Sequence, residues 1–103
     1  MAEFHRVASV QELADGEMMQ VMVNGTEVLL ARIGDEYFAM DDLCTHAYAM
    51  LHFGILHPDT CEVECPLHES YFDLRTGVPT EPADEPEPIY EVKIEGDDIL
   101  VAM

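Results

Sequence analysis

The chain has 103 residues, of which 49% are hydrophobic and 25% charged, so it can form one folded domain with its own core. Its 22 acidic residues against four basic ones give a formal net charge of −18, which excludes binding to nucleic-acid phosphates and disfavours anionic membranes. The same charge favours a basic protein partner met through salt-sensitive encounter, although a simple contribution to solubility is the alternative.

Targeting signals are not evident in the sequence. Residues 1–15 are interrupted by charged side chains and contain no apolar segment of a signal peptide, and no run approaches the ~20 apolar residues of a membrane span. We therefore expect a soluble, cytoplasmic protein. Three cysteines, an odd number in a chain without a secretion signal, argue against a disulfide framework and favour metal ligation.

The first forty residues predict an antiparallel β unit with strands at residues 4–8, 18–23, 28–33 and 36–40. Asn24-Gly25 joins the second and third of these strands and is a strong hairpin signal. Ser9 and Glu12 have the Ser-x-x-Glu spacing of a capping box, which predicts a single helical turn that ends by Gly16.

The rest of the chain predicts shorter strands between loops. Strands are expected at residues 61–64 and 71–74, and a final hairpin at residues 89–94 and 99–102. The acidic, proline-rich residues 79–88 are typical of an irregular surface connection. Several short strands separated by turn signals predict an all-β sandwich or barrel, which we expect to be a single domain over residues 1–103.

Two pairs of metal-ligating residues stand out, Cys44-Thr-His46 and Cys65-Pro-Leu-His68, with eighteen residues between them. Each pair offers one thiolate and one imidazole from a short loop, so two loops could hold one metal centre from opposite sides. A typical zinc finger places both cysteines before both histidines. The alternating order suits a [2Fe–2S] centre in which two thiolates hold one iron and two imidazoles hold the other.

The motif C-x-H-x18-C-x-x-H, which continues as Cys65-Pro-Leu-His-Glu-Ser-Tyr-Phe-Asp-Leu-Arg-Thr-Gly77, resembles the Rieske family. Over essentially the whole chain, the resemblance is greatest to the soluble ferredoxin components of bacterial aromatic-ring dioxygenase systems. It implies one [2Fe–2S] cluster per chain, with the inner iron held by Cys44 and Cys65 and the outer, solvent-facing iron by His46 and His68. It also implies a Rieske-type antiparallel β-sandwich with the cluster at the tip of a small cluster-binding sub-domain, about residues 42–76.

The residues around the ligands resemble those of the low-potential members. Respiratory relatives carry an extra, disulfide-bonded cysteine in each cluster loop, and these positions are Ala49 and Leu67 here. Those relatives also have a serine two residues, and a tyrosine four residues, after the second histidine of the motif. Here the tyrosine position is Phe72 and the serine position is Ser70, where ferredoxins more often have glycine. We hypothesise a potential in the lower part of the Rieske range of about −150 to +300 mV. Ser70 raises it modestly if its hydroxyl donates toward a cluster sulfur rather than facing water.

Other potential ligands have simpler interpretations. His52 and His57 have the H-x4-H spacing of a mononuclear iron site, but such a site also needs a carboxylate on the same face, and Gly54 interrupts any helix here. We expect this pair to lie on the loop that leaves the cluster. Cys61 is expected to pack as a small buried residue, with a ligand or redox-switch role as the minor alternative.

The resemblance implies an electron carrier rather than an enzyme acting alone. As a monomer, the chain would pass single electrons from a flavin-dependent ferredoxin reductase to a terminal oxygenase in aromatic hydrocarbon catabolism. The alternative is a small Rieske subunit or regulatory module of another redox enzyme, such as a nitrite reductase, and a structural zinc module is a third interpretation. The residues expected to shield the cluster, and to centre a docking patch if exposed, are Tyr48, Met50, Leu51, Pro66 and Leu67.

Overall fold

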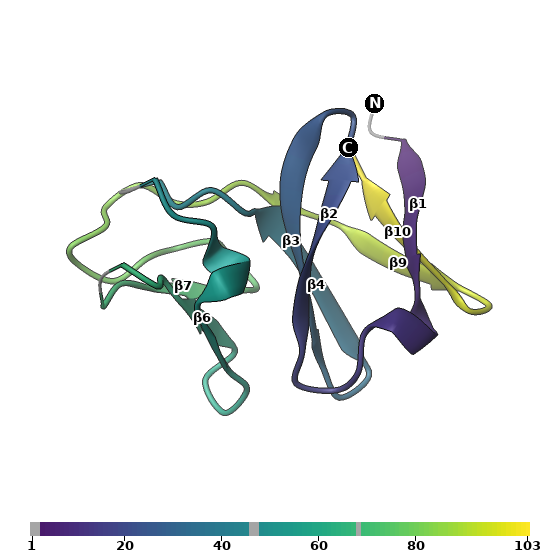
Figure 1. Ribbon diagram of the computed structural model, residues 1–103, viewed down its shortest axis with the longest axis horizontal. Coiled ribbons are helices and arrows are strands. Elements are labelled where there is room, and N and C mark those ends of the chain that lie inside the picture. The colour runs from purple at the N-terminus through teal and green to yellow at the C-terminus, as the bar shows by residue number, and fades with distance from the viewer. Residues whose placement is uncertain (1–2, 46–47, 68) are drawn as a thin grey trace.

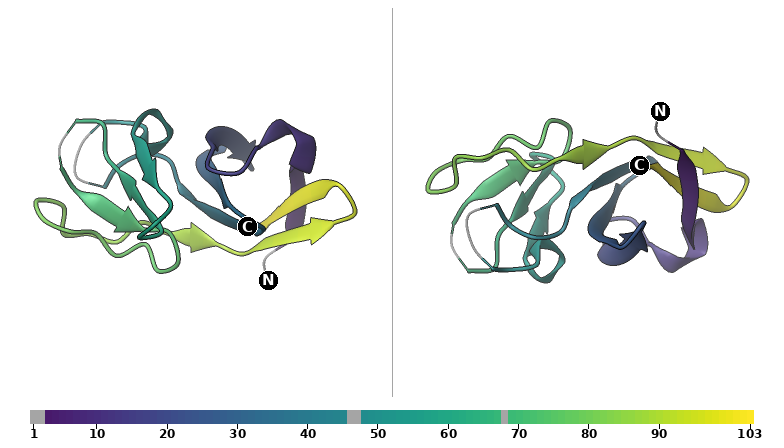
Figure 2. Two further views of the ribbon diagram at one scale, coloured as in Figure 1. Left: turned by 90° about the horizontal axis from the view of Figure 1, so that it is seen from below. Right: turned by 90° about the horizontal axis from the view of Figure 1, so that it is seen from above.

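The computed structural model describes residues 3–45, 48–67 and 69–103, which form antiparallel strands and two short 3₁₀ helices. Figure 1 shows a larger part, here called the base, which carries both chain ends, and a smaller lobe beside it. Two stretches of chain run between the base and the lobe (Figure 2). The all-β antiparallel fold expected from the sequence is confirmed. None of the described helices is long and apolar enough to cross a membrane.

The base contains two antiparallel sheets. One has the strand order β2-β3-β4-β8 and is formed by Met18–Val23 (β2), Thr26–Ile33 (β3), Glu36–Asp41 (β4) and Ile89–Tyr90 (β8). The other has the order β1-β10-β9 and is formed by Phe4–Ser9 (β1), Asp98–Ala102 (β10) and Val92–Glu95 (β9). Ile99 and Val101 of β10 share a buried core with Val28 and Leu30 of β3, so the two sheets pack face to face.

Strand β3 is buried on both faces. Val28 and Leu30 belong to the core of the base, whereas Leu29 and Ala31 belong to the core of the lobe. A strand covered on both sides is expected to be continuously apolar rather than alternating, as these four residues are. Because β3 contributes side chains to both cores, a movement of the lobe relative to β3 would also disturb the packing of the base.

The lobe contains a third antiparallel sheet with the strand order β5-β6-β7, formed by Ile55–His57 (β5), Glu62–Glu64 (β6) and Tyr71–Asp73 (β7). A 3₁₀ helix, η2 (Leu51–Phe53), precedes it. Its core gathers the side chains of Leu51, Val63 and Phe72 together with all three cysteines. Three of the twelve buried residues that the structure describes in this core are therefore cysteines.

The predicted turn at Asn24-Gly25 is confirmed, since both residues have positive φ (51° and 79°), as a two-residue type I′ hairpin requires. The turn predicted after Ser9 is a single 3₁₀ turn, η1 (Val10–Glu12), in which the Ser9 side chain accepts from the Gln11 N–H. Strand β5 and helix η2 are too short to leave a periodic signal and were not predicted.

Residues 79–88, called the strap from here on, are only partly the surface connection that the sequence predicts. Ala83 is buried, and its N–H donates to Ser70 Oγ at 2.9 Å. Thr80 bonds Tyr71 in both directions, because its N–H donates to the Tyr71 carbonyl at 2.8 Å and its Oγ1 accepts from the Tyr71 N–H at 2.9 Å. The strap therefore packs on the lobe and forms one of its walls.

Gly77 allows the strap to approach the lobe. It has φ of +80°, and a Cβ built on it would lie 2.2 Å from the carbonyl oxygen of Glu87 in the strap. The Glu87 N–H also donates to the Gly77 carbonyl at 2.9 Å. Any larger residue would push the strap away at this point.

Gly77→Ala is therefore expected to destabilise the protein more than Gly34→Ala does. Gly34 also has positive φ (+62°), but a Cβ added to it would meet nothing within 4 Å. Gly34→Ala should cost about 1–2 kcal/mol from backbone strain alone, and Gly77→Ala should cost clearly more. Denaturant unfolding of the two variants checks this, and equal losses would show that the strap is not closely packed here.

Candidate metal centre

Cys44 and Cys65 begin two loops of equal length that are closed in the same way. The Cys44 N–H donates to the Ala49 carbonyl at 2.8 Å, and the Cys65 N–H donates to the Ser70 carbonyl at 3.0 Å. We call residues 44–49 the first Cys loop and residues 65–70 the second. The pairs Leu43–Met50 and Glu64–Tyr71 flank these loops, which makes each loop the tip of a hairpin.

The two thiols suit a soft metal centre. Cys44 is 3% exposed and Cys65 is 2% exposed, and neither is in a disulfide. Buried thiolates are favoured ligands of iron–sulfur clusters and zinc. His46 and His68, the other two predicted ligands, lie outside the described residues, so the structure positions only the cysteine half of the predicted set.

The strap holds the first Cys loop through Thr45, the residue between the two predicted ligands of that loop. The Thr45 N–H donates to Glu87 Oε2 at 2.9 Å, and its Oγ1 donates to the Glu85 carbonyl at 2.7 Å. Neither contact is evident in the sequence, because the partners are about forty residues apart. Thr45 thus fixes the loop backbone next to Cys44.

The second Cys loop is held through Ser70, which is fully buried at 0% exposure. The alternative that Ser70 simply faces water is therefore wrong. Its Oγ accepts the Ala83 N–H of the strap, and a serine hydroxyl can accept and donate at the same time. Ser70 can thus link the strap to a group inside the lobe.

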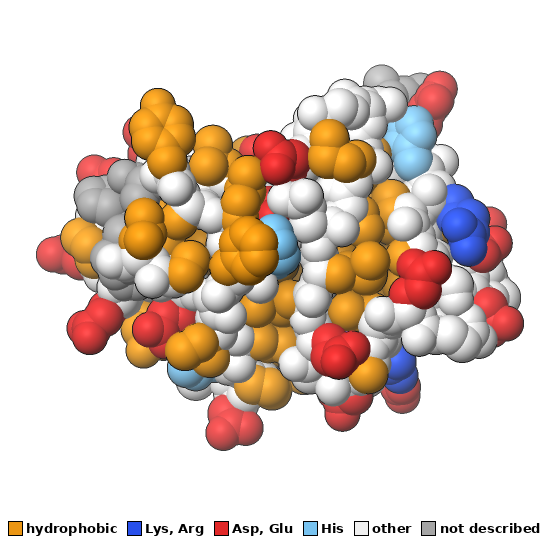
Figure 3. All heavy atoms as spheres, in the orientation of Figure 1, with side chains coloured by type: hydrophobic (Ala, Val, Ile, Leu, Met, Phe, Trp, Pro, Cys, Tyr) orange, Lys and Arg blue, Asp and Glu red, His pale blue; other side chains and the backbone are white. Residues whose placement is uncertain are grey.

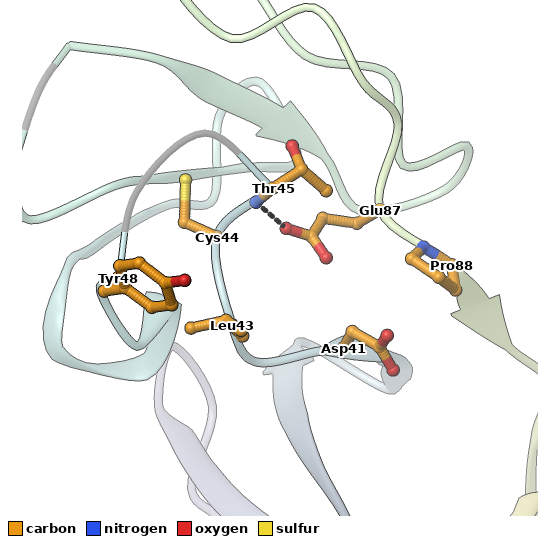
Figure 4. Close-up of a pocket in the computed structure, with 7 residues that line it drawn as sticks. All are labelled: Asp41, Leu43, Cys44, Thr45, Tyr48, Glu87 and Pro88. Atoms are coloured by element: carbon orange, nitrogen blue, oxygen red, sulfur yellow. Dashed lines mark hydrogen bonds between the residues drawn. The ribbon is translucent and has the colours of Figure 1, made fainter.

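Glu87 is the main ionisable group at this site that no sequence pattern indicates. It is 3% exposed, and it lines a pocket of about 480 Å³ together with Asp41, Thr45 and Cys44 (Figure 4). Burial raises the pKa of Glu87 to about 8, with the Thr45 N–H opposing this shift and Asp41 and Asp42 adding to it. The carboxyl group is therefore mostly protonated at neutral pH.

His52 and His57 are each bound to their own carboxylate. His52 Nδ1 contacts Oδ2 of the fully buried Asp42, which also accepts from the His52 N–H at 2.8 Å and from Gln20 of β2 at 2.9 Å. His57 Nε2 lies 2.9 Å from Glu64 Oε1. No group of three metal-ligating side chains forms within residues 3–45, 48–67 and 69–103, so no mononuclear iron site is supported there.

Cys61 is buried just before β6, as expected for a small packing residue. It lies in a turn before β6 rather than in the predicted strand, and its φ of 59° is unusual for a residue with a side chain. Burial raises the pKa of its thiol, although Arg75 opposes this shift. A neutral, buried thiol is a poor candidate for ligation or redox chemistry.

The five residues expected to shield the cluster divide into two groups. Leu51 is fully buried and Met50 half-buried, whereas Tyr48 is 96% exposed, Leu67 is 67% exposed and Pro66 is also exposed. Figure 3 shows hydrophobic side chains gathered over the lobe with acidic ones around them. The tips of both Cys loops thus present an apolar surface to solvent.

Comparison with known proteins identifies the family. The Rieske [2Fe-2S] domain matches residues 3–100. The chain is 40% identical over 95 residues to the anthranilate 1,2-dioxygenase ferredoxin subunit of Burkholderia cepacia, a match that covers 91% of this chain and 86% of that protein. The chain therefore belongs to the Rieske [2Fe-2S] family, which implies a [2Fe–2S] cluster, and the resemblance drawn from its two Cys–His pairs is confirmed.

Solved structures agree with this assignment. The ferredoxin of carbazole 1,9a-dioxygenase from Nocardioides aromaticivorans IC177 has a TM-score of 0.92 at 42% identity, over 95% of each chain. A chain in a complex of reduced oxygenase and oxidized ferredoxin in carbazole 1,9a-dioxygenase has a TM-score of 0.88 at 31% identity, over 96% of this chain and 92% of that one. A putative nitrite reductase small subunit from Mycobacterium tuberculosis has a TM-score of 0.89 at only 20% identity, over 100% of this chain and 96% of that one, so it shows the fold alone.

The raised pKa of Glu87 predicts a pH-dependent stability that Glu87→Gln removes. The folded state keeps this proton up to about pH 8, whereas the ordinary value of 4.5 applies when the chain is unfolded. The stabilisation is therefore complete below about pH 4.5 and is lost as the pH rises through about 8. Relative to wild type, Glu87→Gln should gain about 3 kcal/mol between pH 4.5 and pH 7.

Denaturant unfolding of the holoprotein at several pH values measures this difference. Glu85→Gln is the matched control, because Glu85 is exposed and lies two residues away in the strap. Its pH profile should follow that of the wild type. Parallel profiles for Glu87→Gln and wild type would show that the Glu87 carboxyl titrates normally.

Proposed function

We propose that this chain is a Rieske ferredoxin that carries single electrons from a flavin-dependent ferredoxin reductase to a terminal ring-hydroxylating oxygenase. The observation that carries the proposal is the pair of matched Cys loops, each with a buried thiol at its start, at the tips of two hairpins. The relatives at about 40% identity are named as ferredoxin components of dioxygenase systems rather than as the oxygenases. We regard residues 1–103 as one domain that acts in the cytoplasm as a monomer.

We assign one [2Fe–2S] cluster per chain to Cys44, His46, Cys65 and His68. The cluster, when bound, supplies a one-electron redox couple. The chain's own residues position the ligands: the two loop-closing hydrogen bonds fix the cysteine backbones, and Thr45 and Ser70 connect each loop to the strap. Leu51 and Phe72 exclude water from the inner side of the lobe.

The loop tips provide the surface through which electrons leave. Tyr48, Pro66 and Leu67 are exposed next to the predicted ligands, and Figure 3 shows acidic side chains at the edges of the hydrophobic surface over the lobe. Apolar contacts at the centre and charges at the rim are the usual arrangement of a protein interface. A net charge of −18 increases the rate of encounter with basic surfaces on the reductase and the oxygenase.

The proposal is tested by electron flow through the purified components of an aromatic dioxygenase system. Oxygen uptake with NADH, a ferredoxin reductase and a terminal oxygenase should require this chain and should fall as salt increases. Zinc in place of iron, or oxygen uptake that does not depend on the chain, would contradict the proposed role.

Substitution of the cysteines separates ligands from packing residues. Cys44→Ser and Cys65→Ser should each lose most of the bound iron and the visible absorption of the cluster, as should His46→Ala and His68→Ala. Cys61→Ser is the matched control, since Cys61 is equally buried and lies in the same core. It should retain two irons per chain, and iron loss in Cys61→Ser equal to that in Cys44→Ser would contradict this assignment.

Ser70→Ala should lower the midpoint potential. A hydrogen bond from the Ser70 hydroxyl to the cluster stabilises the more negative reduced state, and about 1–1.4 kcal/mol of differential stabilisation corresponds to about 40–60 mV. Thr80→Val is the control, because it removes another side-chain hydrogen bond between the strap and the lobe outside the Cys loops. An unchanged midpoint potential in Ser70→Ala would show that the hydroxyl binds the strap but does not donate to the cluster.

A further inference from the structure

The two oxygen atoms of Glu87 have different surroundings. Oε2 accepts the Thr45 N–H at 2.9 Å, whereas Oε1 is buried and has no hydrogen-bond partner among the residues that the structure describes. A buried polar atom without a partner is unfavourable, and such atoms are rare in folded proteins. Oε1 can therefore accept a partner that the described residues do not supply.

Oε1 belongs to a carboxyl group that lines a pocket next to the first Cys loop. Figure 4 shows Glu87 between Thr45 and Asp41, with Tyr48 and Pro88 on opposite sides. Leu43 and Tyr48 supply apolar surface at one side of this pocket, and Cys44 also lines it. A ligand in the pocket would thus lie against the loop that carries a predicted cluster ligand.

The charges of the pocket select a cation. Asp41, the other acidic residue in the pocket lining, already accepts a hydrogen bond from the Tyr90 hydroxyl through Oδ1. Within the described part of the chain, no basic residue lines the pocket. The four basic side chains lie elsewhere: Arg6 pairs with Asp98, Lys93 pairs with Glu95, Arg32 donates to the carbonyls of Leu13 and Gly34, and Arg75 follows β7.

We infer that this pocket is a socket for a lysine or arginine side chain of a partner redox protein, which pairs with Glu87 when the partner docks at the first Cys loop. The inference rests on the proposed function, because it names one contact of the electron-transfer complex. The aliphatic part of the entering side chain would cover Leu43 and the Tyr48 ring, both of which are exposed in the free protein. The charged end would then lie beside the Glu87 carboxyl group.

The neutral form of Glu87 in the free protein makes a sharp test possible. Because the carboxyl group is mostly protonated at neutral pH, Glu87→Gln replaces a neutral acid by a neutral amide of the same size. The free protein should keep its fold and cluster. The wild type and Glu87→Gln differ only when a cation enters the pocket. Glu87 then releases its proton to solvent and becomes a carboxylate, which Gln cannot do.

Electron transfer to cytochrome c, a one-electron acceptor with a lysine-rich face, provides the protein probe. The holoprotein is reduced with dithionite and mixed with ferricytochrome c in a stopped-flow instrument at low salt. Glu87→Gln should lower the second-order rate constant about tenfold, because the ion pair that orients the docked complex can no longer form. Glu85→Gln, which removes an exposed charge from the same strap, should change it less than about twofold.

These rate constants test the Glu87 socket separately from the proposed role as an electron carrier. Equal rate constants for Glu87→Gln and Glu85→Gln, with the wild type fast and salt-sensitive, would overturn the socket and leave the carrier role intact. A wild-type protein that transfers no electrons would instead contradict the proposed function itself.

Ethylguanidinium chloride, which carries the charged end of an arginine side chain, tests the pocket directly. At constant ionic strength it should raise the midpoint potential of the wild type to a plateau, because a cation beside the first Cys loop favours the more negative reduced cluster. Sodium chloride should give no plateau, and neither should ethylguanidinium with Glu87→Gln. The same response from wild type and Glu87→Gln would overturn the inference, and so would a wild type that shows no saturable response.

Discussion

Each Cys loop is closed by one backbone hydrogen bond from the cysteine N–H to the carbonyl five residues later, and the strap then bonds to both loops. This arrangement fixes the backbone at Cys44 and Cys65. Each loop has six residues between the flanking pair that closes its hairpin. The strap adds a wall that neither hairpin could supply, since the first loop meets it at Thr45 and the second at Ser70.

The base supports this site through strand β3. Its residues alternate between two cores, with Val28 and Leu30 in the base and Leu29 and Ala31 in the lobe. Asp42 adds a polar connection, because it lies just after β4 and binds Gln20 of β2 as well as His52 of η2. The two Cys loops are thus supported by a rigid sheet. A cofactor site needs such support if its ligands are to stay in place.

The sequence predicts the parts of this structure that depend on local chemistry. Asn24-Gly25 predicts its hairpin because few other residues accept two positive φ values, and the Cys–His pairs predict the family because their spacing is specific. The strap was predicted less well. Its prolines and acids are typical of a solvated connection, and the burial of Ala83 and Glu87 depends on partners that lie far away in the sequence, Ser70 and Thr45. The positive φ of Cys61 has no sequence signal either.

An electron carrier must meet two partners quickly and leave each of them quickly, so its interface should be small and its charge should act mainly on the rate of encounter. The net charge of −18 serves encounter, but a diffuse charge cannot fix how a partner is oriented. Exposed apolar side chains such as Tyr48 and Leu67 add contact area but form no directional bond. A single buried carboxyl group beside the first Cys loop can fix the orientation, because it accepts a basic side chain at only one position. Its high pKa also limits the strength of that contact at neutral pH, since a proton must leave before the ion pair forms.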